Sequence, residues 1–292
     1  MNHDIFAQLI RRSPNVERLI WLTPHTIDFV YPAIVNEKLR VIKLNRCDDL
    51  SIQSLTGNCP NLKVFDVKFM ESIAAESMDK FFASVPHLES LVISNFCQTQ
   101  VIIDSNHFWQ LVALRTLVIN WRQCRNYRTA RPDKSLLLIK ISSSFPDLEV
   151  LELTMLGVTN DGIRGLSQLK NLHRLSLIEN CGNGFSDLDD GIQSLTDCSD
   201  LQELILDKPI ASLTFMSLIR FCAELRFLEV AQILNVDSFA KAAAIMRHYA
   251  PMRSTKLVVS ILDNKSAAFW KSTAVKMALD QAPGNKRMVC FK

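Results

Sequence analysis

The stretch LKVFDV, from Leu62 to Val67, carries the pattern that decides the fold, with apolar residues at its first, fourth and sixth positions. This Leu-x-x-Leu-x-Leu pattern, with apolar substitutes, occurs nine times, beginning at Val16, Leu39, Leu62, Leu88, Leu114, Leu148, Leu172, Leu201 and Leu225. Successive copies start 23 to 34 residues apart, which leaves room for one strand and one helix in each. The chain is therefore built from internal repeats.

The alternation within each copy indicates how its strand is oriented. Side chains of a strand point to opposite faces in turn, so the apolar positions face a core, and the third, fifth and seventh positions face solvent. The sequence predicts an α/β fold, a right-handed leucine-rich repeat solenoid or horseshoe with about ten parallel strands on its concave face and helices on its convex face. We expect residues 1–234 to form the repeats, the first one incomplete, and residues 235–292 to cap the last repeat.

The capping region breaks the repeat period. Residues 238–250 predict a helix, and residues 254–262 predict a tenth strand. Residues 264–282 have the spacing of a long amphipathic helix that ends before Pro283 and Gly284.

Composition is that of a well-packed protein, because 48% hydrophobic residues over 292 positions can bury one long core. The apolar runs at residues 136–141 and 257–262 are too short to cross a bilayer, and residues 1–13 lack the order of charges and apolar residues found in a signal peptide. We expect a cytoplasmic or nuclear location.

The eight cysteines fit a reducing compartment, since the chain has no C-x-x-C motif and no dense cysteine cluster. Six occupy repeat-defined positions where a small core residue is expected, namely Cys47, Cys59, Cys97, Cys181, Cys198 and Cys222. Cys124 and Cys290 follow no repeat position. We expect the six thiols to pack as small apolar groups.

The segment CDDLSIQSLTGNCPNLKVFDV, from Cys47 to Val67, resembles the cysteine-containing leucine-rich repeat of F-box proteins. The matching residues are Cys47, Leu50, Ser51, Cys59, Pro60, Leu62, Phe65 and Val67. Val158–Leu177 and Leu188–Leu206 resemble the same repeat, and the likeness extends over residues 14–232.

The resemblance implies the substrate-binding part of an F-box-type receptor in an SCF cullin-RING ubiquitin ligase. The F-box itself, a three-helix segment of roughly forty residues, is absent from this sequence, so Met1 reads as an internal start, a truncated frame or a lineage without the F-box. The alternative is a stand-alone repeat scaffold or inhibitor that binds a protein. In either case we expect no catalytic centre and no cofactor.

The solvent-facing strand positions predict a concave wall that binds a protein segment. Its early part is basic, its middle exposes apolar residues, and its late part is acidic. The residues predicted to contact the partner are Lys43, Arg46, Lys68, Val92, Val118, Asn120, Glu152, Arg174, Ile205 and Glu229. Charge complementarity across such a wall would set specificity. The alternative is that these are ordinary solvated strand positions.

The longest step between repeats contains a cationic insertion, WRQCRNYRTARPDKS, from Trp121 to Ser135. Its predicted contact residues are Trp121, Arg122, Arg125, Arg128 and Arg131. Forked guanidinium donors suit an acidic or phosphorylated degron, and a solvated loop is an equal alternative. Nucleic acid is the least favoured partner because the formal net charge of the chain is only +3.

The helix following the sixth repeat strand has a readable start. Thr159 or Asn160 is predicted to cap it, and Ile163, Leu166 and Leu169 recur on one face. The insertion at residues 181–190 reads as a turn. The six histidines fall in unrelated repeat phases, so the sequence predicts no metal site.

Overall fold

The computed structural model describes residues 15–22, 36–96, 98, 100–121, 134–154, 158–178, 188–234, 244, 248, 257–261, 275–282 and 285–291. The chain divides into two compact units. The N-terminal unit comprises residues 1–130 and 143–148, and the C-terminal unit comprises residues 131–142 and 149–292.

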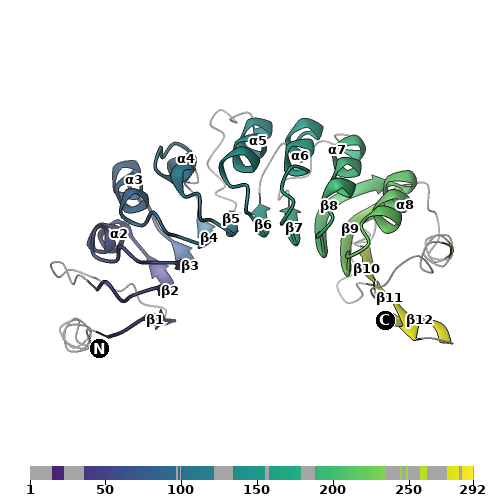
Figure 1. The fold of residues 1–292 in the computed structure, drawn as a ribbon, viewed down its shortest axis with the longest axis horizontal. Coiled ribbons are helices and arrows are strands. Elements are labelled where there is room, and N and C mark those ends of the chain that lie inside the picture. Colours follow the sequence, from purple (N-terminus) through teal and green to yellow (C-terminus); the bar gives the residue numbers. More distant parts are fainter. Residues whose placement is uncertain are drawn as a thin grey trace. The chain divides into compact units, whose positions relative to one another are not determined.

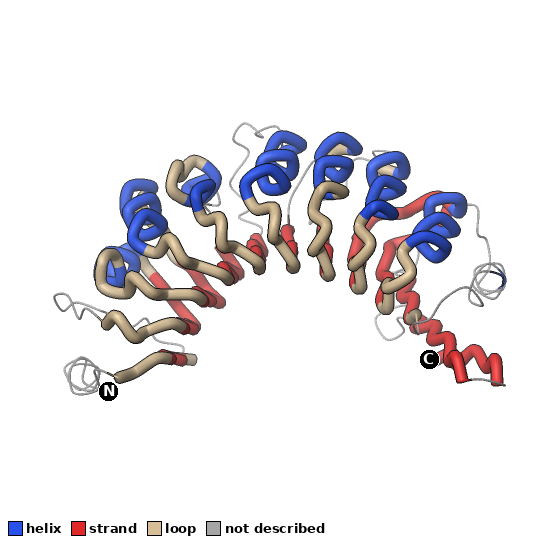
Figure 2. Tube along the Cα trace, in the orientation of Figure 1, coloured by secondary structure: helices blue, strands red, loops and turns tan. Residues whose placement is uncertain are grey.

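Strands of the N-terminal unit pair in parallel and in sequence order. They are β1 (Arg18–Trp21), β2 (Val41–Cys47), β3 (Val64–Met70), β4 (Ser90–Phe96) and β5 (Thr116–Trp121). The helical segments between them are α2 (Asp49–Leu55), α3 (Ala75–Ser84), α4 (Gln100–Ile103) and the 3₁₀ turn η1 (Phe108–Gln110). Figures 1 and 2 show these helices on one side of the strands.

The C-terminal unit repeats this arrangement. Its parallel strands are β6 (Val150–Thr154), β7 (Arg174–Ile178), β8 (Glu203–Ala211), β9 (Phe227–Leu234) and β10 (Val258–Ile261). Its helical segments are α6 (Asn160–Leu166), α7 (Asp189–Ser194), the 3₁₀ turn η2 (Leu195–Asp197) and α8 (Ser212–Phe221), together with most of α5 (Lys134–Ser144). Two antiparallel strands, β11 (Val275–Ala282) and β12 (Asn285–Phe291), follow β10.

The predicted alternation of buried and exposed strand positions is confirmed. In β2, Ile42 and Leu44 are 0% and 1% exposed, whereas Lys43 between them is half-buried. The leucines that open the repeats from Leu39 to Leu225 are also buried. With five parallel strands and their helices in each unit, the fold is an α/β leucine-rich repeat solenoid, as the sequence predicts.

The core of the N-terminal unit contains a continuous run of aromatic rings. Phe65 lies 4.8 Å from Phe81 between ring centroids, and Phe82 lies 5.4 Å from Phe108. Phe108 lies 5.3 Å from Phe145, so the run passes from the strand layer through successive repeats. These tilted and edge-on arrangements are the favourable ones for aromatic pairs. The described core of the C-terminal unit is mainly aliphatic, and Phe215 is the one fully buried aromatic side chain among its described residues.

Helix starts follow the sequence signals. Thr159 caps α6 by accepting a hydrogen bond from the Gly162 N–H at 3.3 Å, which confirms the predicted cap. Asp48 caps α2 in the same way, accepting from the Ser51 N–H at 2.8 Å. Each cap satisfies an amide that the helix itself leaves unpaired.

A second set of hydrogen bonds joins the start of one helix to the next repeat. Asp49 Oδ1 accepts from the Ala74 N–H at 2.8 Å, ahead of α3. Asn160 Oδ1 accepts from the Gly191 N–H at 2.7 Å, in α7, and Asp189 Oδ1 accepts from the Ala211 N–H at 2.8 Å, ahead of α8. We call these three bonds the helix-start ladder.

The cap prediction is wrong over residues 275–282. The predicted tenth strand is present as β10, but the residues expected to continue a long helix form β11, which pairs antiparallel with β10 and β12. The helical spacing was outweighed by pairing along the open edge of β10, and the Pro-Gly pair separating β11 from β12 is a turn signal as well as a helix stop. The predicted helix at 238–250 lies almost entirely outside the described residues, and the division at residue 234 stays a prediction.

The described cysteines pack as predicted. Cys47, Cys59, Cys198 and Cys222 are buried free thiols. Burial raises the pKa of the Cys59 thiol to about 12 and that of Cys198 to about 11, so neither is a reactive thiolate. Over the described residues, no helix combines the length and the hydrophobicity needed to span a membrane.

Candidate partner-binding faces

Each unit presents one sheet face away from its helices, and in-register pairing arranges the outward side chains in rows. The N-terminal face consists of the rows Arg18, Val41, Val64, Ser90, Thr116 and Ile20, Lys43, Asp66, Val92, Val118, with Ser94 and Asn120 beyond them. The C-terminal face consists of the rows Val150, Arg174, Glu203, Phe227, Val258 and Glu152, Ser176, Ile205, Glu229, Ser260. The predicted solvent-facing positions therefore do line up within each unit.

One cation of the N-terminal face, Lys43, is paired with a carboxylate of the neighbouring strand. Lys43 Nζ lies 3.1 Å from Asp66 Oδ2 in the adjacent strand. Lys68 is exposed near the end of β3, with its Nζ 6.0 Å from the centroid of the Phe69 ring. Both cations are at the surface, where such contacts contribute little stability but orient the side chain. The basic character predicted for this region is partly offset by Asp66.

Two predicted contact residues of this unit need correction. Val118 occupies an outward position in register with Val92 but is only 8% exposed, so it offers little apolar surface to a partner. Arg46 is exposed but lies outside the rows, since the burial of Leu44 and Cys47 breaks the two-residue alternation between them.

Arg46 instead approaches a neighbouring carboxylate. Its Nε lies 3.8 Å from Glu71 Oε1, just beyond the end of β3. Val92 and Asn120 do occupy outward positions on the N-terminal face and are half-buried.

The C-terminal face is organised by Arg174. Its Nη1 donates a hydrogen bond of 2.7 Å to Glu203 Oε2, and its Nε lies 2.7 Å from Glu152 Oε1. The three residues come from adjacent strands β7, β8 and β6, so one guanidinium bridges two carboxylates across the sheet. Arg174 and Glu152 were predicted as independent partner contacts, and the structure shows them paired with each other.

Glu229 and Ile205 lie in the next part of this face. They are half-buried and opposite each other in register on β9 and β8. Phe227 stands two residues before Glu229 and opposite Glu203. Glu203 and Phe227 were not among the predicted contact residues. Both occupy third positions of the repeat, which is the sequence feature that could have identified them.

The arginine insertion cannot be placed. Arg122, Arg125, Arg128 and Arg131 lie outside the described residues, and of Trp121 only the backbone, at the end of β5, is described. Their predicted role as an anion grip remains a prediction.

A polar cluster in the N-terminal unit joins α3 to the turn before η1. Ser105 Oγ donates to Asp79 Oδ1 at 2.7 Å, and His107 Nδ1 lies 2.9 Å from Asp79 Oδ2. These hydrogen bonds, that from Ser105 first, hold the pKa of Asp79 below its usual range. Because Ser105 bonds to the carboxylate rather than to the imidazole, the set lacks the hydroxyl-to-base contact of an activated serine.

No group of three or more His, Cys, Asp or Glu side chains capable of holding a metal ion occurs in the described part of the chain. The prediction that the chain has no catalytic centre stays a prediction.

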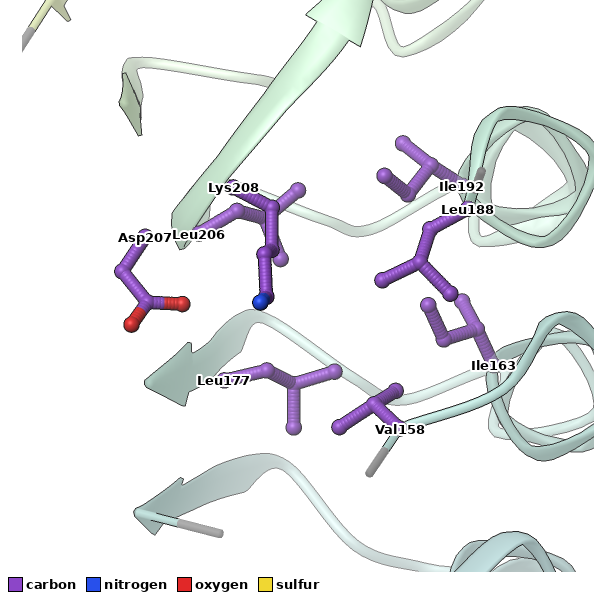
Figure 3. A pocket seen from close by; sticks show the side chains of 8 residues that line it. All are labelled: Val158, Ile163, Leu177, Leu188, Ile192, Leu206, Asp207 and Lys208. Atoms are coloured by element: carbon purple, nitrogen blue, oxygen red, sulfur yellow. The ribbon is translucent and has the colours of Figure 1, made fainter. Parts of the chain in front are cut away.

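A pocket opens in the C-terminal unit between strands β7 and β8 and helices α6 and α7 (Figure 3). The space inside it that water-sized molecules can occupy is only about 10 Å³. Its walls are aliphatic, and Asp207 and Lys208 are its only polar lining residues. Small-molecule sites usually occupy about 300–1,000 Å³ and contain converging polar groups. We therefore interpret this pocket as a packing gap under the sheet rather than a ligand site.

No family model and no curated protein matches this chain. Among solved structures, an internalin from Listeria monocytogenes is similar with 13% sequence identity and a TM-score of 0.44. The likeness covers 77% of this chain and 58% of the internalin, so the chain spans less than two thirds of that protein's length. The fold assignment rests on the strand order and burial within each unit.

Proposed function

We propose that this chain recognises a protein partner through the outward sheet faces of its two units. The observation that carries the proposal is the contrast between the two sides of each strand. Leu91 and Ile93 in β4 are fully buried, like the apolar positions of the other repeats, whereas Val92 between them belongs to an outward row, Ile20, Lys43, Asp66, Val92 and Val118, that mixes apolar and charged side chains. A rigid core with variable outward positions is the arrangement that repeat proteins use for binding.

The finer proposal is that the partner is a ubiquitination substrate and the chain is the recognition part of an F-box-type receptor. Its support is the cysteine-containing repeat from Cys47 to Val67, in which both cysteines pack in the core as that repeat class requires. Docking to a cullin scaffold would then depend on an F-box segment joined to this solenoid. We further propose a reducing cytoplasmic or nuclear compartment, which the four buried free thiols support.

The test is quantitative affinity capture with mass spectrometry, using matched pairs of variants. Val92→Arg alters the N-terminal face, and Val112→Arg places the same change at a turn residue that is 66% exposed. Ile205→Arg and Leu213→Arg form the corresponding pair in the C-terminal unit, with Leu213 70% exposed on α8.

Loss of a shared partner with Val92→Arg or Ile205→Arg, but not with the helix-side and turn controls, supports recognition through the sheet faces. Equal capture by all four variants would contradict it. Recovery of cullin-scaffold subunits together with the partner, by a version of the chain carrying its native upstream sequence, supports the ligase role. Recovery of the same partner without any cullin subunit would make the chain a stand-alone scaffold.

A further inference from the structure

We propose that the C-terminal face binds a basic segment of the partner and holds an arginine side chain over the quartet Glu203, Phe227, Ile205 and Glu229. This inference rests on the proposed function and gives the partner a definite chemistry. It concerns only the C-terminal unit.

The quartet has a checkered arrangement. Glu203 is in register with Phe227, and Ile205 is in register with Glu229. Parallel neighbours lie about 4.8 Å apart, and alternate residues of one strand about 6.6 Å apart. The two carboxylates therefore occupy one diagonal of a small rectangle, and the two apolar side chains occupy the other. A guanidinium is planar, so it can donate from its edge to carboxylates while its face packs on an aromatic or aliphatic surface.

Arg174 shows how this face holds a guanidinium. Its guanidinium on β7 lies 2.7 Å from the Glu152 carboxylate on β6 and 2.7 Å from the Glu203 carboxylate on β8. Glu203 therefore already serves as one side of such a bridge. On its other side the diagonal carboxylate is Glu229, for which no ion pair is present within the described residues. An arginine from a partner would approach from outside the sheet and bridge Glu203 and Glu229, which lie on the adjacent strands β8 and β9.

The charge of the C-terminal face favours a basic ligand. The C-terminal face carries Glu152, Glu203 and Glu229 against Arg174, three negative groups and one positive, for a net charge of −2. Complementary charge steers a partner to such a face and sets its register, with apolar contact supplying the anchor.

A second observation points to the same end of the face. Ser260 follows in register with Glu229 on β10, is fully buried, and its Oγ has no hydrogen-bond partner anywhere in the described structure. A buried hydroxyl without a partner is unfavourable.

The experiment is selection of peptides from a phage-displayed library of random sixteen-residue segments on the immobilised full chain. Enriched peptides are then measured by fluorescence anisotropy against the wild type and three variants. We expect enriched peptides to carry arginine and net positive charge. Glu229→Gln should lower the affinity for these peptides about three- to tenfold, because it removes one part-exposed charge contact. Raising the salt concentration should lower the affinity further.

Two variants distinguish a specific effect from a loss of structure. Arg174→Gln removes the internal cation and frees Glu203, so it should raise the affinity for the same peptides. Asp190→Asn changes an exposed carboxylate on α7, on the helix side, and should leave the affinity unchanged.

The outcomes separate this inference from the proposed function. Enrichment of neutral or acidic peptides, or binding that ignores Glu229→Gln, would overturn the basic-segment inference while leaving protein recognition in place. Failure to enrich any peptide would overturn both.

Discussion

The two units share one arrangement of strands and helices but differ in their core residues and in their outward sheet faces. The N-terminal unit packs a run of aromatic rings from Phe65 to Phe145 and presents a face whose Lys43 is neutralised by Asp66. The C-terminal unit has a mainly aliphatic described core and presents an acidic face around Arg174. Since strand pairing and helix placement are the same in both, core chemistry and face chemistry vary independently of the repeat framework.

The largest expected effect comes from opening the aromatic run. Phe108 is 1% exposed and contacts the rings of Phe82, Trp109 and Phe145. Phe108→Ala should lower the free energy of unfolding by about 3–5 kcal/mol, because it removes a buried ring and leaves a cavity. Urea unfolding followed by fluorescence measures this.

The matched control compares the two cores directly. Phe215 is buried in the C-terminal unit without a ring contact among the described residues. Phe108→Leu should therefore destabilise more than Phe215→Leu, by about 0.5–1.5 kcal/mol, the contribution of aromatic pairing. Equal losses at the two positions would mean that ring contacts add nothing beyond burial.

The second prediction concerns the tight joint between α6 and α7. A Cβ at Gly191 would lie 2.8 Å from the carbonyl oxygen of Asn160 and 2.9 Å from its Cα, so the backbone would have to shift. Gly191→Ala should cost about 1–3 kcal/mol of unfolding free energy in spite of the better helix propensity of alanine.

Gly165→Ala is the control in the same unit. Its nearest contact would be the Cγ1 of Ile139 at 3.2 Å, a side-chain atom that can adjust. A smaller loss there, measured by the same denaturant titration, is expected. A larger loss at Gly165 than at Gly191 would contradict the assignment of the tight joint.

The third prediction tests the difference between the two faces. Arg174→Met should lower the free energy of unfolding by about 1 kcal/mol or less, since it leaves the carboxylates on the two flanking strands without their shared cation. Lys43→Met should lower it by less, because it breaks one exposed ion pair. The measurement is thermal unfolding at low and high salt. The gap between the two variants should narrow with added salt, and a gap that is independent of salt would indicate a packing effect instead.

The smallest expected effect is a pH dependence confined to the N-terminal unit. The lowered pKa of Asp79, caused mainly by the Ser105 hydrogen bond, means that its carboxylate stabilises the fold above the ordinary aspartate pKa of about 3.9 and that this contribution disappears as pH falls through the lowered value. The Tm difference between wild type and Asp79→Asn should be largest at neutral pH and shrink at acid pH.

Asp161→Asn, which removes an exposed helix pair with Arg164, is the control and should change Tm less. A Tm difference at Asp79 that stays constant down to pH 2 would show that the substitution acts through geometry rather than charge.

The sequence predicted the strand positions and their outward rows well, because every repeat must bury the same three apolar positions. Whether an outward residue is accessible is less predictable, since the exposure of Val118 depends on its neighbours along and across the sheet. Pairing is likewise non-local. Arg174 and Glu203 are 29 residues apart in the chain, and only the register between β7 and β8 brings them together.

The region after β10 shows where local reasoning fails. Val275, Met277 and Leu279 recur at every second residue, which is the spacing of a strand, and the open edge of β10 provides the partner with which it pairs. The hydrogen bonds between successive helices were not predicted either, because Asp and Asn are common at any helix start, and the sequence shows no partner for Asp49, Asn160 or Asp189 in the next repeat. Their acceptor role toward the following repeat depends on spacing between helices that a single repeat does not encode.

The helix-start ladder also has a mechanical consequence. Each of its bonds, such as those that Asn160 accepts from Gly191 and Asp189 accepts from Ala211, connects one repeat to the next. A stretching force along the C-terminal unit would load these two successive joints in series, so the weaker would open first and leave the other closed. The C-terminal unit should therefore lengthen in steps of one repeat under tension instead of rupturing in a single event.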